Sequence, residues 1–93
     1  MTRVIARVCA LPGRESTVEV ALRQLVLPTR GERGCVRYEL FQGLEDPHVF
    51  IFDETWESEA AHETHMRSPH LQRILAEAGP FLAGPPDIRR YPG

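Results

Sequence analysis

The order in which strand-type and helix-type hydrophobic patterns follow one another is the strongest constraint on the fold of this chain. Apolar residues at alternate positions, bounded by turn residues, predict strands over residues 4–10, 35–42, 48–56 and 87–91. Apolar residues at helical spacing predict a helix over residues 15–27, ended by Pro28, and a second that Ser68 caps and that begins at Pro69. Ser58 is a good N-cap for a further helix that runs to about Met66.

This order of elements is the ferredoxin-like arrangement of the α+β class. The sequence therefore predicts an antiparallel sheet with helices on one face. No linker, repeat or low-complexity segment interrupts the pattern, so residues 1–93 are expected to form one domain.

The third predicted strand is apolar on both faces. One face carries Phe50, Phe52, Glu54 and Trp56, and Ile51 lies among the residues of the other. Because helices can cover only one face of the sheet, we expect the open face to pack against a second copy of the chain, as a two-fold homodimer. The alternative is a monomer with a sparse apolar open face.

The composition excludes several classes of protein. The formal net charge of -2 offers no basic footprint for nucleic acid and no polybasic patch for a membrane surface. No run of about 18 apolar residues predicts a membrane span, and no secretory leader is apparent at the first residues. All 11 basic residues are arginine, which we interpret as the codon bias of a GC-rich, bacterial genome.

Two cysteines, Cys9 and Cys35, lie within apolar runs. We expect both to be buried, reduced thiols, as in a cytoplasmic protein, because neither belongs to a redox or disulfide motif.

A carboxylate and a tryptophan share the aromatic face of the third strand. Trp56 is either an ordinary core residue or the wall of a pocket for a planar ligand, to which Phe50 and Phe52 would add. Glu54 is costly to bury unless it is paired or protonated. It is therefore either the partner of a nearby arginine or helix N-terminus, or a carboxyl group of raised pKa that exchanges protons.

The histidines that follow this strand are further candidates. His62 and His65 are on one helix face, but their spacing is not that of zinc peptidases and no third ligand is evident, so no metal site is predicted. His65 is better explained as a hydrogen-bonded pocket residue or an acid–base group, and His70 could turn toward the same space. Tyr38 is either a core tyrosine or a phenol that donates to a ligand.

An ordered set of short motifs covers nearly the whole chain. The set comprises Leu11-Pro12-Gly13, Pro28-Thr29-Arg30 with Glu32, Gly34 and Cys35, Tyr38-Glu39-Leu40, Glu45-Asp46-Pro47, Glu54-x-Trp56-x-Ser58-x-x-Ala61-x-x-x-His65, and Ser68-Pro69-His70. In this order the motifs resemble the antibiotic biosynthesis monooxygenase (ABM) domain of the small, quinol-monooxygenase-like type.

The resemblance implies a dimeric α+β barrel and a pocket built around Glu54, Trp56 and His65, with Tyr38 as a companion. Some family members oxidise phenols or quinols with molecular oxygen and without a metal, flavin or other cofactor, inside a dry aromatic pocket. The polyketide-tailoring members carry an asparagine on the third strand, where Phe52 stands here, and this chain has no asparagine. Haem-degrading relatives use an asparagine where this chain has Arg7, so haem degradation is not expected.

Three hypotheses of function follow from these observations. The leading one is a cofactor-independent monooxygenase that acts on a small aromatic, phenol or quinol. The second is a non-oxidative enzyme, such as an isomerase, which uses the same histidine and glutamate for proton transfer. The third is a binding or stress-response module that holds a small ligand without converting it, because one fold can host all three.

Overall fold

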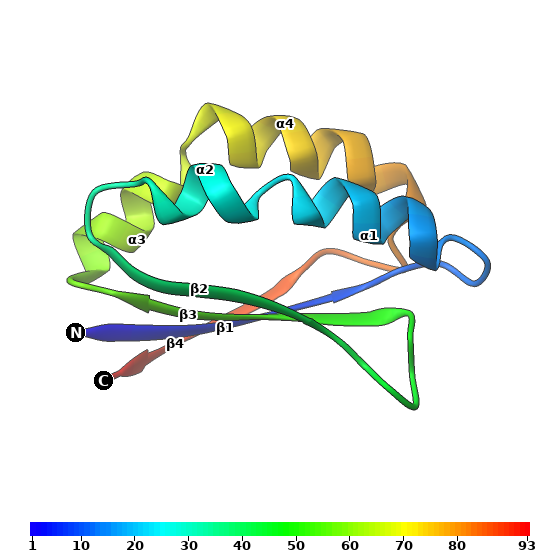
Figure 1. The fold of residues 1–93 in the computed structure, drawn as a ribbon, viewed down its shortest axis with the longest axis horizontal. Coiled ribbons are helices and arrows are strands. Elements are labelled where there is room, and N and C mark those ends of the chain that lie inside the picture. Colours follow the sequence, from blue (N-terminus) through cyan, green and yellow to red (C-terminus); the bar gives the residue numbers. More distant parts are fainter.

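A four-stranded antiparallel sheet forms one layer of the molecule, and the helices lie together on one of its faces (Figure 1). The computed structural model describes residues 1–93. The strands are β1 (Thr2–Cys9), β2 (Cys35–Gln42), β3 (Val49–Trp56) and β4 (Asp87–Pro92). Across the sheet they lie in the order β2-β3-β1-β4. The helices are α1 (Glu15–Arg23), α2 (Val26–Arg30), α3 (Glu59–Met66) and α4 (Pro69–Ala78), followed by the 3-10 turn η1 (Gly79–Phe81). The predicted α+β, ferredoxin-like architecture is confirmed.

The helix predicted over residues 15–27 is divided into two helices. The backbone N–H groups of Gln24 and Leu25 bond to carbonyls only three residues back, at 3.2 and 3.1 Å, which tightens the chain between α1 and α2. The prediction that Pro28 ends a helix is wrong. Pro28 lies in the first turn of α2, where a backbone N–H has no carbonyl partner within the helix, so proline costs no hydrogen bond there.

The serines before α3 and α4 differ in the hydrogen bonds that their side chains make. Ser58 caps α3 as predicted, since its Oγ accepts a hydrogen bond of 3.1 Å from the backbone N–H of Ala61. The prediction that Ser68 caps α4 is wrong, because its side chain makes no capping bond. Its Oγ lies instead 3.4 Å from Nε2 of His70. Pro69 occupies the first helical position, as the sequence predicted.

The covered face of β3 forms the centre of the core. β3 pairs with β2 on one side and β1 on the other, so neither edge of the strand is free. Its four side chains on the covered face are all buried, and the alternate residues are half-buried, as the sequence pattern predicted. Against this face α1 and α4 pack their apolar residues, of which the fully buried ones are Val18, Leu22 and Ile74.

The open face of the sheet mixes charged and apolar side chains. Arg3 and Arg37 lie 3.1 and 3.5 Å from the carboxylate of Asp53, at the centre of this face. Phe41, which is 50% exposed, is paired with Ile51 on the neighbouring strand. The expectation of apolar residues on this face is met, although an ion-pair network divides them.

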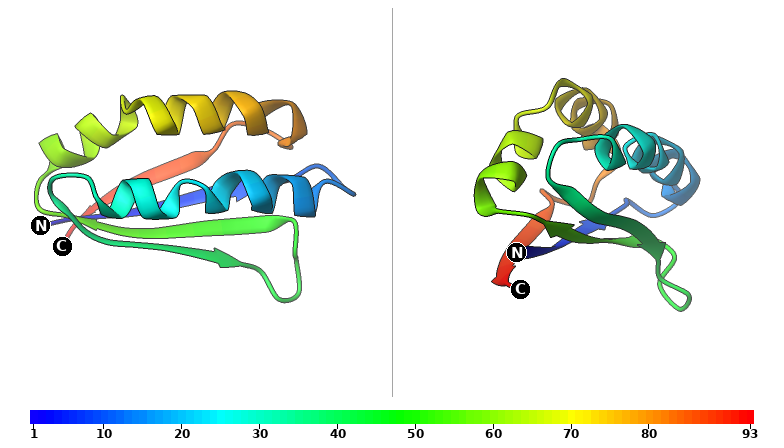
Figure 2. Two further views of the ribbon diagram at one scale, coloured as in Figure 1. Left: turned by 45° about the horizontal axis from the view of Figure 1, so that its top comes forward. Right: turned by 60° about the vertical axis from the view of Figure 1, so that its left-hand side comes forward.

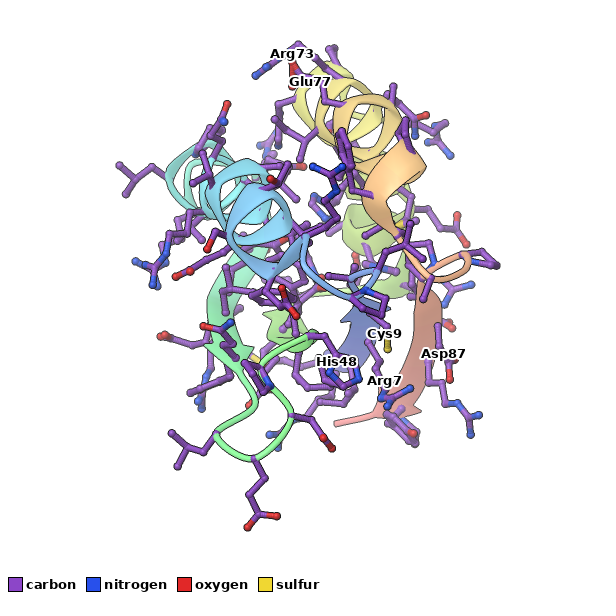
Figure 3. The ribbon with its side chains drawn as sticks, turned by 90° about the vertical axis from the view of Figure 1, so that its right-hand side faces the viewer. Arg7, Cys9, His48, Arg73, Glu77 and Asp87 are labelled. Carbon is purple, nitrogen blue, oxygen red and sulfur yellow. The ribbon has the colours of Figure 1, made fainter.

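The remaining surfaces are those of an ordinary small domain. Figure 2 shows the two termini side by side at one end of the sheet, where the backbone N–H of Gly93 bonds to the carbonyl of Met1 at 2.9 Å. Figure 3 shows Arg73 and Glu77 on the outer side of α4, where they form an exposed pair at 3.5 Å.

None of the helices has the length and hydropathy that a bilayer crossing needs. Cys9 and Cys35 are free thiols, half-buried rather than fully buried.

Candidate active site

A narrow cavity lies between the covered face of the sheet and the helices. Its polar or aromatic walls come from β2, β3 and α3 and are Tyr38, Phe52, Glu54, His62 and His65. Apolar side chains make up the rest of the lining, namely Ala6, Val8, Leu22, Leu25, Met66, Leu71, Leu75, Pro86 and Ile88. The site is therefore an almost wholly apolar space whose lining residues include one carboxylic acid, one tyrosine and two histidines.

The cavity is small as the side chains stand. Its volume is about 30 Å³. That is room for about two water molecules, whereas an apolar cavity known to admit benzene measures about 150 Å³. A ring-sized ligand can enter only if lining side chains move. Met66, Leu75, Pro86 and Ile88 are the candidates, because they are not fully buried.

Glu54 is the acidic group of the cavity. It is only 3% exposed, and no arginine compensates its charge. Its Oε1 accepts a hydrogen bond of 2.9 Å from Nε1 of Trp56 and lies 4.0 Å from Nε2 of His62. Burial raises the pKa of Glu54 to about 7, although the indole N–H lowers it in part. Near neutral pH this carboxyl group is therefore divided between its acid and base forms.

His62 has no hydrogen-bond partner for either ring nitrogen, although both are buried. Burial, together with the neighbouring His65, lowers the pKa of His62 to about 4. At neutral pH His62 is consequently a neutral imidazole beside the carboxyl group of Glu54. An unpaired buried polar group costs roughly 1–3 kcal/mol, so its retention in the core marks it as a candidate functional residue.

His65 is held by a carboxylate that also holds His70. Oε2 of Glu32 lies 2.7 Å from Nδ1 of His65 and 2.9 Å from Nε2 of His70. A carboxylate can only accept, so the neutral ring of His65, which is one of the lining residues, carries its proton on Nδ1 and leaves Nε2 as an acceptor. Burial lowers the pKa of His65, although the bond to Glu32 opposes this shift.

Tyr38 supplies the phenol. Its side chain is 2% exposed, and its ring packs against those of Phe52 and His65, with centroids 5.1 and 5.5 Å apart. Burial raises the pKa of Tyr38 well above its usual range, and the charge of Glu54 raises it further, whereas a hydrogen bond with Thr29 lowers it. The group is therefore a neutral hydrogen-bond donor or acceptor, not a phenolate.

Comparison with models of known protein families shows to which family this chain belongs. The model described as antibiotic biosynthesis monooxygenase matches residues 1–77, which run from β1 into α4. The chain belongs to the antibiotic biosynthesis monooxygenase family.

Individual relatives agree with this assignment to the ABM family. Rv0793 of Mycobacterium tuberculosis, provisionally named a monooxygenase, is 33% identical over 82 residues, which cover 88% of this chain and 80% of the relative. The crystal structure of PA3566 from Pseudomonas aeruginosa superimposes with a TM-score of 0.90 at 34% identity and covers 97% of this chain and 90% of its own. An uncharacterised Synechocystis protein, sll1783, is 30% identical over 77% of this chain, which spans 50% of that protein.

Of the residues that the sequence singled out, this ABM domain brings five to the cavity. The other three lie behind its wall. Trp56 is fully buried and stacks on His65 with ring centroids 4.8 Å apart, Phe50 belongs to the core, and His70 lies on the far side of Glu32. Trp56 thus acts through its contacts with lining residues and does not itself wall the cavity.

Glu32 is the residue that sequence reasoning missed as part of the site. It lies in the turn before β2, 33 residues from His65 along the chain, so no local period connects the two. The only signal was its place within the motif set. The structure also shows which groups could hold a metal ion, because ligand atoms of Glu32, His65 and His70 lie within 4.8 Å of one another. His62, which shares a helix face with His65, is not one of the three.

Proposed function

We propose that this ABM domain is a cofactor-independent monooxygenase whose substrate is a small phenol or quinol. The observation that carries the proposal is Glu54, a nearly buried carboxyl group with a pKa of about 7 in an apolar cavity. A general base is most effective when its pKa lies near the working pH. The family membership of the chain is consistent with this chemistry.

The groups of the cavity suit the removal of a proton from a phenol. The carboxylate of Glu54 or Nε2 of His65 would accept a phenolic proton, and the neutral Tyr38 would hold a substrate oxygen by a hydrogen bond. An electron-rich phenolate can then reduce molecular oxygen directly. For a quinol, one oxygen atom is added to the ring and the other leaves as water. The organic product is a hydroxyquinone, and the substrate supplies all the electrons.

The apolar walls support such a reaction in two ways. They exclude water, which strengthens each electrostatic contact with the substrate, and they offer aromatic surfaces that match a planar ring. Because the cavity measures about 30 Å³, binding must displace side chains at its rim. We expect the rim residues Met66 and Ile88, which line the cavity, to contact a bound ring and so to set the size of substrate that is accepted.

Oxygen uptake with a panel of substituted hydroquinones tests this proposal. The protein is first treated with a chelator, and the rate is corrected for autoxidation with heat-denatured protein. Glu54→Gln is expected to lower the rate about 100-fold or more, since removing a general base typically costs 10²–10⁴. Glu45→Gln, on an exposed loop, is the matched control and should leave the rate unchanged. A wild type that never exceeds the autoxidation rate would overturn the proposal.

A proton-transfer enzyme that does not use oxygen is the second candidate. The proximity of Glu54 to His62, at 4.0 Å, favours it, because a carboxyl group and an unpartnered imidazole can move a proton between two positions of one substrate. Conversion of a hydroxycarbonyl compound under argon at the same rate as in air would favour this candidate. A quinol that binds but is converted under neither atmosphere would point to a binding module.

A further inference from the structure

We propose that Glu32, His65 and His70 form a binding site for one divalent transition-metal ion of the Zn²⁺ type. The site adjoins the cavity and shares His65 with its lining, but it does not include Glu54. It goes beyond the proposed function, which uses no metal.

The three residues come from three elements that meet at one end of the helical layer. Glu32 lies in the turn between α2 and β2, His65 in the last turn of α3 and His70 in the first turn of α4. Their ligand atoms already converge, with Oε2 of Glu32 at 2.7 Å from Nδ1 of His65 and 2.9 Å from Nε2 of His70. Helices position the two histidines, and a short turn between α2 and β2 positions Glu32, so the three ligand atoms are brought together before any ion binds.

The donor set suits a borderline metal ion. Two imidazoles and one carboxylate are the protein ligands of several zinc enzymes, and the same set binds Fe²⁺ in other proteins. Hard ions such as Ca²⁺ and Mg²⁺ prefer oxygen donors and would bind poorly.

The charge of Glu32 is not balanced by an arginine. Its side chain is only 15% exposed, and its ion-pair partners are the two histidines alone. A dication would therefore neutralise a largely buried anion that now rests on hydrogen bonds to two imidazoles. The neighbouring hydroxyls of Thr29 and Ser68, each 3.4 Å from Nε2 of His70, could bond a water molecule that completes the coordination.

The present spacing needs only small adjustments. With metal–ligand distances of about 2.1 Å, tetrahedral ligand atoms lie roughly 3.4 Å apart. The two short contacts, at 2.7 and 2.9 Å, would have to lengthen by some tenths of an ångström. His70 is the ligand best able to move, because its side chain is 21% exposed and lies at the start of its helix.

Occupation of the site changes what His65 presents to the cavity. A neutral imidazole that ligates through Nδ1 must carry its proton on Nε2. The ion would therefore take the place of the Nδ1 proton, which transfers to Nε2. His65 would become a hydrogen-bond donor toward the cavity instead of an acceptor.

Metal titration of the purified, chelator-treated protein tests the proposal. Co²⁺ is added as the spectroscopic probe and Zn²⁺ in a parallel calorimetric titration. We expect one ion per chain, with visible absorption bands whose intensity is typical of four-coordinate Co²⁺. Glu32→Gln and His70→Ala should each weaken binding about 10-fold or more, because each removes one of three protein ligands. His48→Ala, a histidine outside the cluster, should bind as the wild type does.

A second measurement keeps the test independent of folding defects in the variants. Nitrogen chemical shifts of the histidine rings in the wild type should show the proton of His65 on Nδ1 without metal and on Nε2 with Zn²⁺. Failure to bind either ion at millimolar concentration, or equal binding by all variants, would overturn the proposal. Neither result bears on the oxygen-uptake experiment, which is done in the presence of chelator.

Discussion

The indole Nε1 of Trp56 donates a hydrogen bond of 2.9 Å to Oε1 of Glu54, so the tryptophan and the buried carboxyl group form one unit. Both residues are on the covered face of β3, two positions apart. The indole offers a single donor and no compensating charge, which lowers the pKa of Glu54 less than burial raises it. An ordinary arginine partner would instead have kept this carboxyl group ionised.

Glu54→Gln is expected to alter how stability depends on pH. The pKa of Glu54 is about 7 in the folded chain against 4.5 for the free group, so its stabilising contribution is complete below pH 4.5 and is lost as the pH rises through 7. Glutamine cannot ionise but keeps an acceptor for Trp56. The free energy of unfolding of the variant, measured with urea, should therefore rise by about 2–3 kcal/mol relative to that of wild type as the pH is raised from 5 to 8. Parallel profiles of the two proteins would contradict the raised pKa.

His62→Leu should show the opposite trend. The pKa of His62 is about 4 in the folded chain against 6.5 for the free group, so its contribution is present above pH 6.5 and is lost as the pH falls through 4. Leucine has a similar size and leaves no unpaired nitrogen in the core. We expect the free energy of unfolding of the variant to rise by about 2 kcal/mol relative to that of wild type when the pH is lowered from 7.5 to 5. A gain at high pH instead would refute the assignment of a neutral imidazole.

Gly34 and Gly13 offer a matched test of backbone strain and crowding. Both have positive φ, at 86° and 81°, but a Cβ added at Gly34 would lie 2.7 Å from Cβ of Ala61, whereas one at Gly13 would meet nothing within 4 Å. Gly13→Ala should thus cost only the conformational penalty of about 1–2 kcal/mol. Gly34→Ala should lower the free energy of unfolding by clearly more, because the added Cβ would also clash with Ala61. The double variant with Ala61→Gly should recover part of the loss, and strictly additive effects would argue against the contact.

Ser58→Ala should destabilise the protein more than Ser68→Ala. Only Ser58 caps its helix through its side chain, because its Oγ accepts a hydrogen bond of 3.1 Å from the backbone N–H of Ala61. Loss of such a cap costs about 1 kcal/mol. Thermal unfolding of both variants measures the difference. Equal losses would show that the capping bond of α3 contributes little.

The open face of the sheet is expected to join two copies of the chain. Wild type should elute with twice the 10.6 kDa mass of the chain in size-exclusion chromatography with light scattering. Phe41→Glu places a charge on the half-exposed apolar part of this face and should shift the equilibrium to the monomer. Leu44→Glu is the control, because Leu44 is fully exposed at a loop. A monomeric wild type at micromolar concentration would disprove this prediction.

Local patterns accounted for most of the architecture. The alternation of β3 placed Glu54 and Trp56 on one face, and Ser58 marked the start of α3, because both signals depend only on neighbouring residues. The helix before β2 was less well predicted. Its apolar spacing continues through the break between α1 and α2, since the spacing reports which residues face the core and not whether the backbone bonds are continuous.

The sequence by itself determined the order of the elements, the covered and open faces of the sheet and the family of the chain. Only the tertiary structure decided that Glu54 bonds to Trp56 without an arginine, that Glu32 joins His65 to His70, and that the cavity is too small for a ring as it stands. The physical reason is range. Hydrophobic periods and caps are set within a few residues, whereas the contacts of Glu32, the cavity and the lack of an arginine beside Glu54 depend on how distant segments pack together.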